Sequence, residues 1–274
     1  MCGIVAFIGN KNAAPVLLKG LKRLEYRGYD SAGIAVWNNG LKVSKKAGKV
    51  ADLEEQLTAD QLSGTVGIGH TRWATHGAPN DINAHPHLSG NSKLAIIHNG
   101  IIENHSTVKE ELIRRGHKFL SDTDTEVLIH LIEEIQETEN STLEEAVRIA
   151  LNQVSGAYAI VVISEDNPNE MIAARKGSPL VMGIGKGEYF MASDATPIVE
   201  YTRNVIYLDD GQMVRVDLDG YRISNIKDNS SHTPTIHELE ISLEQLEKGG
   251  FDHFMLKEIY EQPRAIYDTM RGRL

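Results

Sequence analysis

Two groups of short strand-like runs, with helix-like segments between them, restrict the possible folds of this chain more than any other feature of the sequence. The first group lies in residues 1–100 and the second in residues 157–217. Turn signals such as Asn38-Asn39-Gly40 and Asp209-Asp210-Gly211 separate the runs. Because strands and helices do not alternate regularly, the pattern predicts an α+β fold with two sheets and helices outside them.

Apolar runs mark the expected strands, and apolar residues at helical spacing mark the expected helices. The expected strands are Ile4–Ile8, Ala32–Trp37, Lys42–Lys46, Val66–His70, Leu94–His98, Ala157–Ile163, Glu170–Ala174, Leu180–Ile184, Tyr189–Ala192, Val205–Tyr207 and Gln212–Asp217. The expected helices run from Pro15 to near Gly28, over Asn104–Arg115, over Thr123–Gln136, and onward from Ser141, which forms a capping-box pattern with Glu144. Gly183–Gly187 lacks Walker spacing, so we expect a hairpin there.

The C-terminal stretch differs from the rest of the chain. Lys227–Pro234 is polar and predicts a loop, and Leu243–Lys248 predicts a short helix. Phe251–Leu274 is amphipathic, as expected for an element whose packing partner is not in this chain. We therefore predict one domain over residues 1–240 and a linker segment over residues 241–274.

Cys2 is the only cysteine and directly follows Met1. If Met1 is removed, Cys2 carries both a thiol, which is nucleophilic once deprotonated, and a free α-amine, which titrates near ~8 and can act as its base. Gly3 lets a ligand approach closely, and the apolar run Ile4–Ile8 would hold the terminus inside the fold. These neighbours favour a nucleophile over an incidental cysteine.

The charge balance argues against several classes of protein. With 28 basic and 38 acidic residues the formal charge is −10, which disfavours nucleic acid as a partner. A single cysteine excludes an internal disulfide framework. No apolar run approaches the ~20 residues needed to cross a bilayer, and no secretory signal is present. We expect a cytoplasmic protein without a membrane partner.

Polar residues crowd into one segment after an expected strand. The segment is Gly69-His70-Thr71-Arg72-Trp73-Ala74-Thr75-His76-Gly77. An arginine there can hold a substrate carboxylate through a bidentate fork, or it can be an ordinary solvated surface residue. The crowding of polar and aromatic residues between two glycines favours a site.

The motif His98-Asn99-Gly100 follows another expected strand. The amide of Asn99 and the backbone N–H of Gly100 are a possible donor pair for a developing oxyanion. An ordinary Asn-Gly turn is the alternative, and the spacing does not distinguish the two.

Asp124 lies at the start of an expected helix. Thr123 and Glu126 match a capping box, and the helix dipole favours an acid in the first turn. Asp124 is therefore either a helix-start residue, which the spacing favours, or the binding partner of a substrate ammonium group.

Histidines are frequent between residues 70 and 105, namely His70, His76, His85, His87, His98 and His105. They raise the possibility of a metal site. Zinc sites show compact ligand spacings, and His85-Pro86-His87 is not one of them. We therefore predict no metal and no other cofactor.

Taken together, the motifs resemble one family. Five segments resemble, in the same order, the glutaminase (class II glutamine amidotransferase) domain of the glutamine–fructose-6-phosphate aminotransferase family. They are Met1–Val5, Leu24–Gly33, Gly69–Gly77, His98–Asn104 and Ser121–Glu126. The resemblance covers residues 2 to about 240. The segment Phe254–Pro263 resembles the family's connection into a sugar-isomerase domain, which is absent from this chain.

This resemblance implies an N-terminal-nucleophile hydrolase fold, a four-layer αββα sandwich of two antiparallel sheets. It also implies that Met1 is removed and that Cys2 is the nucleophile, with its own amine as base. By matching position, Asn99 and Gly100 would form the oxyanion hole, and Arg27 would help to position the nucleophile.

The remaining roles concern the substrate, L-glutamine. The resemblance implies that Arg72 binds its α-carboxylate and Asp124 its α-ammonium group. Thr75 and His76 would line the pocket, Gly77 would allow close passage of the chain, and Trp73 would gate the exit of ammonia. The full-length family member would be a homodimer that passes ammonia to fructose 6-phosphate. Three alternatives stay open: another amidotransferase of the same class, a non-catalytic glutamine-binding domain if Met1 is retained, or a histidine metal protein.

Overall fold

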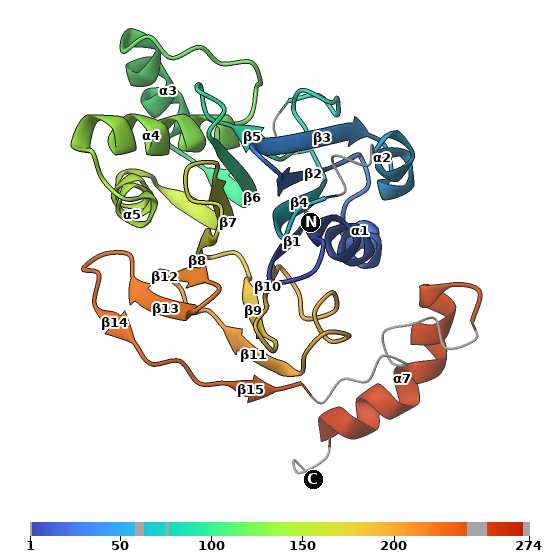
Figure 1. Cartoon of the computed structure of the whole chain (residues 1–274). Helices are drawn as coiled ribbons and strands as arrows, with labels where there is room; N and C mark the ends of the chain where they lie inside the picture. The colour runs from blue at the N-terminus through green and yellow to red at the C-terminus, as the bar shows by residue number, and fades with distance from the viewer. Residues whose placement is uncertain (1, 58–62, 75–76, 240–250, 271–274) are drawn as a thin grey trace. The chain divides into compact units, whose positions relative to one another are not determined.

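The computed structural model describes residues 2–57, 63–74, 77–239 and 251–270 (Figure 1). Two compact units make up the chain, Met1–Glu238 and Leu239–Leu274. All of the described strands and most of the described helices belong to the first unit.

The first unit contains two antiparallel sheets. The strand order of the first sheet is β15-β11-β9-β10-β1-β4-β2-β3. Its strands are β1 (Gly3–Ile8), β2 (Ser31–Trp37), β3 (Leu41–Ala47), β4 (Val66–Arg72), β9 (Val181–Ile184), β10 (Tyr189–Ala192), β11 (Asn204–Tyr207) and β15 (His237–Glu238). The first strand of the chain therefore lies at the centre of the sheet, between β4 and β10.

The second sheet has the order β14-β13-β12-β8-β7-β6-β5. Its strands are β5 (His87–Leu88), β6 (Leu94–Ile102), β7 (Gly156–Ser164), β8 (Glu170–Lys176), β12 (Gln212–Asp217), β13 (Gly220–Asn225) and β14 (Ser231–His232). Each sheet takes strands from both halves of the unit, so neither can form until both groups of strands are present.

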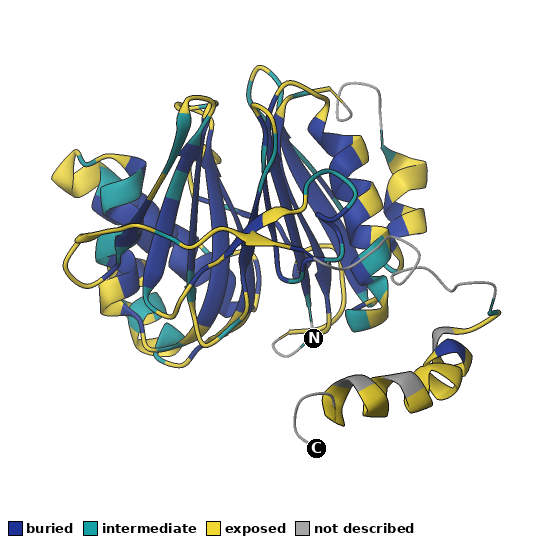
Figure 2. Ribbon diagram, turned by 90° about the horizontal axis from the view of Figure 1, so that it is seen from below, coloured by how far each residue is buried: buried dark blue, intermediate teal, exposed yellow. Residues whose placement is uncertain are grey.

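Helices cover the outer face of each sheet. Helix α1 (Ala13–Leu24) contacts β1 and β4, and α2 (Val50–Gln56) contacts β2 and β3. On the other side, α4 (Asp124–Glu139) contacts β5 and β6, α5 (Leu143–Gln153) contacts β8, and α3 (His105–Arg114) contacts α4. Figure 2 shows the resulting layers, with buried residues concentrated in the two sheets and on the helix faces turned towards them.

Apolar cores hold these layers together, and two of them involve the second sheet. One lies between the sheets and includes Ile4, Ile68, Ile97 and Val161. The other lies between the second sheet and its helices. Every residue of β1 is buried, because both faces of this strand are covered, and that explains why its sequence reads as a continuous apolar run rather than an alternating one.

Most elements expected from the sequence are present. The expected strands correspond to β1–β4 and β6–β12, and the expected helices to α1, α3, α4 and α5. The hairpin expected around Gly183–Gly187 joins β9 to β10. The expected short helix at Leu243–Lys248 lies outside the described residues.

Three details were wrong. Helix α5 is capped by Thr142, whose side chain accepts from the N–H of Glu145, and not by Ser141 with Glu144. Thr123 does cap α4, but the Glu126 carboxylate accepts from the N–H groups of Leu120 and Ser121 and not from that of Thr123. Within the polar stretch expected as a loop, residues 231–232 pair with β13 as the short strand β14.

In the second unit, helix α7 (Phe254–Met270) begins close to the expected position. Large apolar side chains such as Met255, Tyr260 and Tyr267 are exposed on it. This matches the amphipathic pattern of the sequence. Among the described residues, no helix is both long enough and apolar enough to cross a membrane.

Candidate active site

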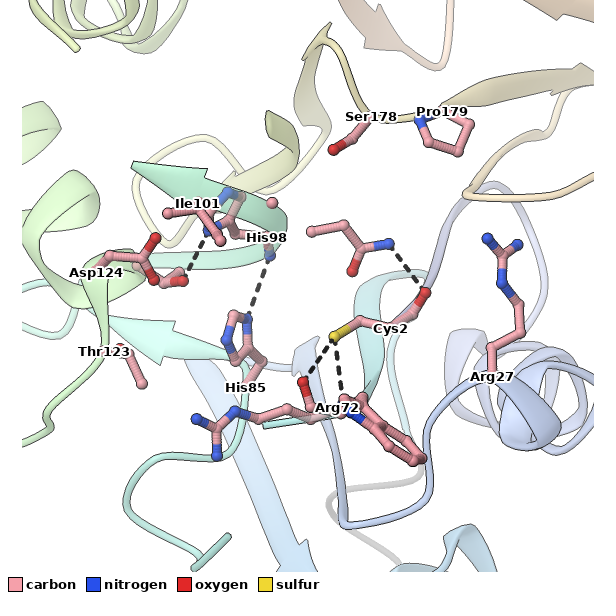
Figure 3. Close-up of a pocket in the computed structure, with 14 residues that line it drawn as sticks. Cys2, Arg27, Arg72, His85, His98, Ile101, Thr123, Asp124, Ser178 and Pro179 are labelled. Carbon is pink, nitrogen blue, oxygen red and sulfur yellow. Dashed lines mark hydrogen bonds between the residues drawn. The ribbon is translucent and has the colours of Figure 1, made fainter. Parts of the chain in front are cut away.

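A cavity of about 400 Å³ opens at the start of β1 and brings together residues that are far apart in the sequence (Figure 3). The elements that meet there are β1, the end of β4, the end of β6 and the start of α4. The lining residues are Cys2, Arg27, Arg72, Trp73, His85, His98, Asn99, Gly100, Ile101, Thr123, Asp124, Thr125, Ser178 and Pro179.

Cys2 is half-buried at the edge of this cavity. Its Sγ accepts a hydrogen bond from the backbone N–H of Trp73 at 3.3 Å and lies 3.6 Å from the Trp73 carbonyl oxygen. Burial raises the pKa of the Cys2 thiol above its ordinary value, and the Trp73 hydrogen bond opposes that shift only in part. The thiol therefore needs a base to become a nucleophile near neutral pH.

Asn99 and Gly100 belong to β6 and pair with Ala159 and Tyr158 of β7. The expectation that they follow the strand was wrong, and so was the alternative of an Asn-Gly turn. Gly100 has φ +135°, and a Cβ there would lie 2.0 Å from the Ala157 carbonyl oxygen. Only glycine fits this position without displacing the neighbouring strand.

The side chain of Asn99 is oriented by two hydrogen bonds. Its Oδ1 lies 2.9 Å from Nε2 of His70, and its Nδ2 donates to the backbone oxygen of Cys2 at 3.2 Å. The amide N–H₂ group is thus directed towards the residue that bears the thiol. This is the end of the side chain that would stabilise an oxyanion.

Several of the clustered histidines pack behind this site as neutral rings. The His70 and His85 rings stack with centroids 4.2 Å apart, and His87 meets His85 edge-on. Burial lowers the pKa values of His70 and His87 to about 3 and that of His85 well below its ordinary value. Neutral imidazoles can stack without charge repulsion, so this part of the cluster forms a polar core.

Arg72 is the last residue of β4, not a residue of the following loop. Its side chain is buried, and Nη1 donates to the Ala78 carbonyl oxygen at 3.3 Å. Gly77 lies in the same connection, with φ +76° and Asn83 Nδ2 only 2.6 Å from where a Cβ would be. A larger residue at position 77 would therefore collide with Asn83.

Asp124 is the first residue of α4 and is buried against the end of β6. One of its carboxylate oxygens accepts from the Ile102 N–H at 2.8 Å. Figure 3 shows Asp124 and Arg72 on the same side of the Cys2 thiol in this view. A cationic and an anionic side chain thus line one cavity, which suits an α-amino acid with both its charges.

Trp73 and Arg27 also line the cavity. The Trp73 side chain is about half exposed and meets the Tyr29 ring edge-on at 5.6 Å. Arg27 ends the short 3₁₀ helix Glu25–Arg27, and its Nη1 lies 3.4 Å from Asp194 Oδ2. Both residues line the cavity, as expected for groups near the nucleophile.

Two expected site residues, Thr75 and His76, lie outside the described residues. Conversely, the cavity contains residues that sequence reasoning did not single out, among them Thr125, Ser178 and Pro179. Ser178 and Pro179 follow Gly177, which has φ +76°. A Gly-Ser-Pro turn signal was therefore available in the sequence, but nothing in it showed that this turn lines the cavity of Cys2.

Comparison with known proteins identifies the family of this chain. The profile of the glutamine amidotransferase domain family matches residues 49–222. The chain is 56% identical to a glutamine–fructose-6-phosphate aminotransferase (isomerizing) of Chlorobaculum tepidum and 56% identical to one of Bacteroides thetaiotaomicron. All of this chain is covered in both cases, but only 45% of each relative, so the chain spans less than half the length of these curated relatives.

Solved structures agree with the fold. A glutamine phosphoribosylpyrophosphate amidotransferase from B. subtilis superposes with a TM-score of 0.72 at 29% identity. The match covers 83% of this chain and 50% of that one. The expected N-terminal-nucleophile sandwich of two antiparallel sheets between helices is confirmed. On this evidence the chain belongs to the family of glutamine amidotransferase domains.

Proposed function

We propose that this chain, after loss of Met1, hydrolyses L-glutamine to glutamate and ammonia through the thiol of Cys2. One observation supports this most strongly: a single cavity is lined by the nucleophile, the donor pair Asn99 and Gly100, and the opposite charges of Arg72 and Asp124. A thiol with these neighbours suits acyl transfer from the side-chain amide of an amino acid.

Binding of glutamine would use both of its charges. The guanidinium of Arg72 presents its N–H groups to the α-carboxylate, and the carboxylate of Asp124 accepts from the α-ammonium group. Because one Asp124 oxygen is already held by the Ile102 N–H, the orientation of this carboxylate is fixed before substrate arrives. Asparagine has a side chain one methylene shorter, so its amide carbon would not reach Cys2.

The first half of the reaction forms a thioester. The α-amine of Cys2 takes the thiol proton, and the thiolate attacks the side-chain carbonyl carbon of glutamine. Electrons of the carbonyl move to oxygen, and the oxyanion is stabilised by Asn99 Nδ2 and the Gly100 N–H. When the intermediate collapses, the C–N bond breaks and the α-ammonium group of Cys2 donates its proton to the departing ammonia.

The second half uses the same groups to hydrolyse the thioester. Water loses a proton to the α-amine of Cys2 as its oxygen attacks the thioester carbon. Collapse of this second tetrahedral intermediate expels the thiolate, which recovers the proton from the α-ammonium group. Glutamate leaves, and no metal or other cofactor enters these steps.

The residues around the nucleophile would have supporting roles. Arg27 would hold the nucleophile end in position, and Trp73 would gate the exit of ammonia. Gly77 would keep the connection after β4 close to the pocket, whose wall would also include Thr75 and His76. Two features support the gating role: the Trp73 side chain is about half exposed, and the backbone N–H of the same residue donates to Cys2 Sγ.

Similar proteins support a proposal for the full-length protein. Curated relatives with 56% identity are named glutamine–fructose-6-phosphate aminotransferases. We infer that residues 1–240 are the glutaminase domain and residues 241–274 the link to a sugar-isomerase domain. Ammonia would be passed to fructose 6-phosphate there, giving glucosamine 6-phosphate, in a cytoplasmic homodimer.

The direct test is ammonia release from L-glutamine, with glutamate measured in the same sample. Equal amounts of both products are expected from the chain lacking Met1, and none from a Cys2→Ala variant. Addition of fructose 6-phosphate to this chain alone should yield no amino sugar. If Cys2→Ala releases ammonia at the parent rate, the proposal is wrong.

A further inference from the structure

Outside the cavity, three potential metal ligands converge between the end of α3 and the middle of α4. They are His117, His130 and Glu133. Nδ1 of His117 lies 2.9 Å from Nδ1 of His130 and 3.7 Å from Oε2 of Glu133, and Nδ1 of His130 lies 3.6 Å from the same oxygen. The three donor atoms therefore form a compact triangle.

Local structure explains why these side chains meet. His130 and Glu133 are three positions apart on α4, so they share one face of the helix. His117 is placed by the end of α3, where Gly116 has φ +101°, the His117 N–H donates to the Leu112 carbonyl, and the Gly116 N–H donates to the Ile113 carbonyl. This is the Schellman arrangement, which fixes the direction of the chain after a helix.

Both imidazoles face a carboxylate with their other nitrogen. His117 Nε2 lies 2.9 Å from Glu134 Oε2, and His130 Nε2 lies 3.8 Å from Glu126 Oε1. Histidines that bind metals usually direct their second N–H to a carboxylate, which leaves the first nitrogen with a free electron pair for the ion. A bound ion would hold both rings in that tautomer, with both Nδ1 electron pairs directed to it.

The third ligand is also held in place. Oε2 of Glu133 accepts from the Gly90 N–H at 2.8 Å, and Oε1 accepts from the Asn91 N–H at 2.7 Å. These two residues belong to the turn between β5 and β6. A bound ion would therefore connect the end of α3, helix α4 and this turn.

The distances suit a small tetrahedral ion. Two ligands bound to one zinc ion at 2.0–2.1 Å and at a tetrahedral angle lie about 3.3–3.4 Å apart. The observed separations of 2.9, 3.6 and 3.7 Å bracket that value. Two imidazoles and a carboxylate suit zinc better than calcium or magnesium, which prefer oxygen ligands alone.

We propose that His117, His130 and Glu133 bind Zn²⁺, with water as the fourth ligand. The ion replaces the proton that the two Nδ1 atoms share at 2.9 Å, and that proton is released to solvent. None of the three ligands lines the cavity of Cys2, so the site is separate from the reaction. Its effect would be structural: the ion would help to hold α4 in place, and this helix also carries Asp124.

The test uses the chain with Cys2→Ala, since a free thiol also binds zinc. After treatment with a chelator, the protein is titrated with Zn²⁺ against a chromogenic competitor, and with Co²⁺ by absorption. One equivalent of Zn²⁺ should bind, and Co²⁺ should give a tetrahedral spectrum without thiolate charge transfer. Zinc should also raise the thermal midpoint.

Matched variants identify the ligands. His117→Gln in the same background should bind Zn²⁺ at least 10-fold more weakly and lose the thermal shift, whereas His232→Gln, at an exposed histidine of β14, should behave as the parent. Glu134→Gln should weaken binding by about 10-fold through its contact with His117. It also provides the test if His117→Gln does not fold. Non-saturable binding, or equal affinity in the folded variants, would overturn the site.

Discussion

Nε2 of the buried His70 lies 2.9 Å from Oδ1 of Asn99 and 3.1 Å from the His98 carbonyl oxygen. Both partners are acceptors, so Nε2 carries the proton and donates it. Nδ1 of the same ring has no hydrogen-bond partner among the described residues, which is consistent with a neutral imidazole. Because His70 donates to Oδ1 of Asn99, it orients the Asn99 amide with its N–H₂ group towards Cys2.

We expect His70→Leu to lower turnover of glutamine by about 10-fold or more, because the Asn99 amide would lose the donor that orients it. His70→Gln should retain most of the rate, since its terminal N–H₂ can replace the Nε2–H donor. Steady-state kinetics should show the loss mainly in kcat. A leucine variant that folds and turns over at the parent rate would remove His70 from this positioning role.

Asn99→Ala removes the side-chain donor of the oxyanion hole. One such donor is typically worth ~3 kcal/mol, so kcat should fall by a factor on the order of hundreds, with a smaller change in KM. Asn99→Asp is a useful companion, because it can still accept from His70 but offers no N–H₂ group. If both variants keep the parent kcat, Asn99 does not stabilise the oxyanion.

Asp124→Asn tests the ammonium site with little disturbance of the helix start. Asparagine can still accept from the Ile102 N–H, but the negative charge is lost. Hydrogen bonds to charged groups are worth about 1.5–3 kcal/mol, so the KM for glutamine should rise by about 10- to 100-fold. The variant should unfold near the parent midpoint. An unchanged KM would assign Asp124 to the helix start alone.

The acid stability of the fold should depend on Glu126. Burial opposes its charge, but contacts with His130 and the N–H groups of Leu120 and Ser121 lower its pKa from 4.5 to about 2. A lowered carboxyl pKa contributes stability above the unfolded pKa, and this contribution is lost as pH falls towards 2. Glu126→Gln should thus be less stable than the parent at pH 5, and the difference should shrink between pH 4.5 and 2.

Urea unfolding at each pH measures this difference in the free energy of unfolding. A chelator is present because bound metal would add a separate pH dependence. Glu139→Gln, an exposed position near the end of α4, is the matched control and should follow the parent at every pH. A difference between parent and Glu126→Gln that stays constant from pH 5 to pH 2 would contradict the assigned cause.

The sequence predicted the strands and helices well where apolar periodicity was strong. It placed the ends of β4 and β6 too early, because Thr71-Arg72 and Asn99-Gly100 interrupt the apolar runs, whereas pairing with neighbouring strands continues through them. That error had a consequence for function. Asn99 and Gly100 were expected after a strand, where a turn was possible, whereas both residues are held within strand β6.

The site itself could be predicted only in part. The residue types pointed to Cys2 and Arg72, and the family resemblance added Asn99 and Asp124. That these residues meet depends on pairings between segments distant in sequence. The histidines show the same limit. Their number raised a metal site around residues 70–105, whereas His70 and His85 stack as neutral rings and the compact metal-ligand triangle among the described residues involves His117.

The central claim is that Cys2 supplies both nucleophile and base, which requires its amine to be free. Intact mass and ammonia release from L-glutamine should be measured on one sample, beside a sample in which Met1 is retained. We predict that the mass lacks Met1 and that only this sample releases ammonia and glutamate in equal amounts. A chain without Met1 that does not hydrolyse glutamine, or equal activity with Met1 retained, would contradict the account.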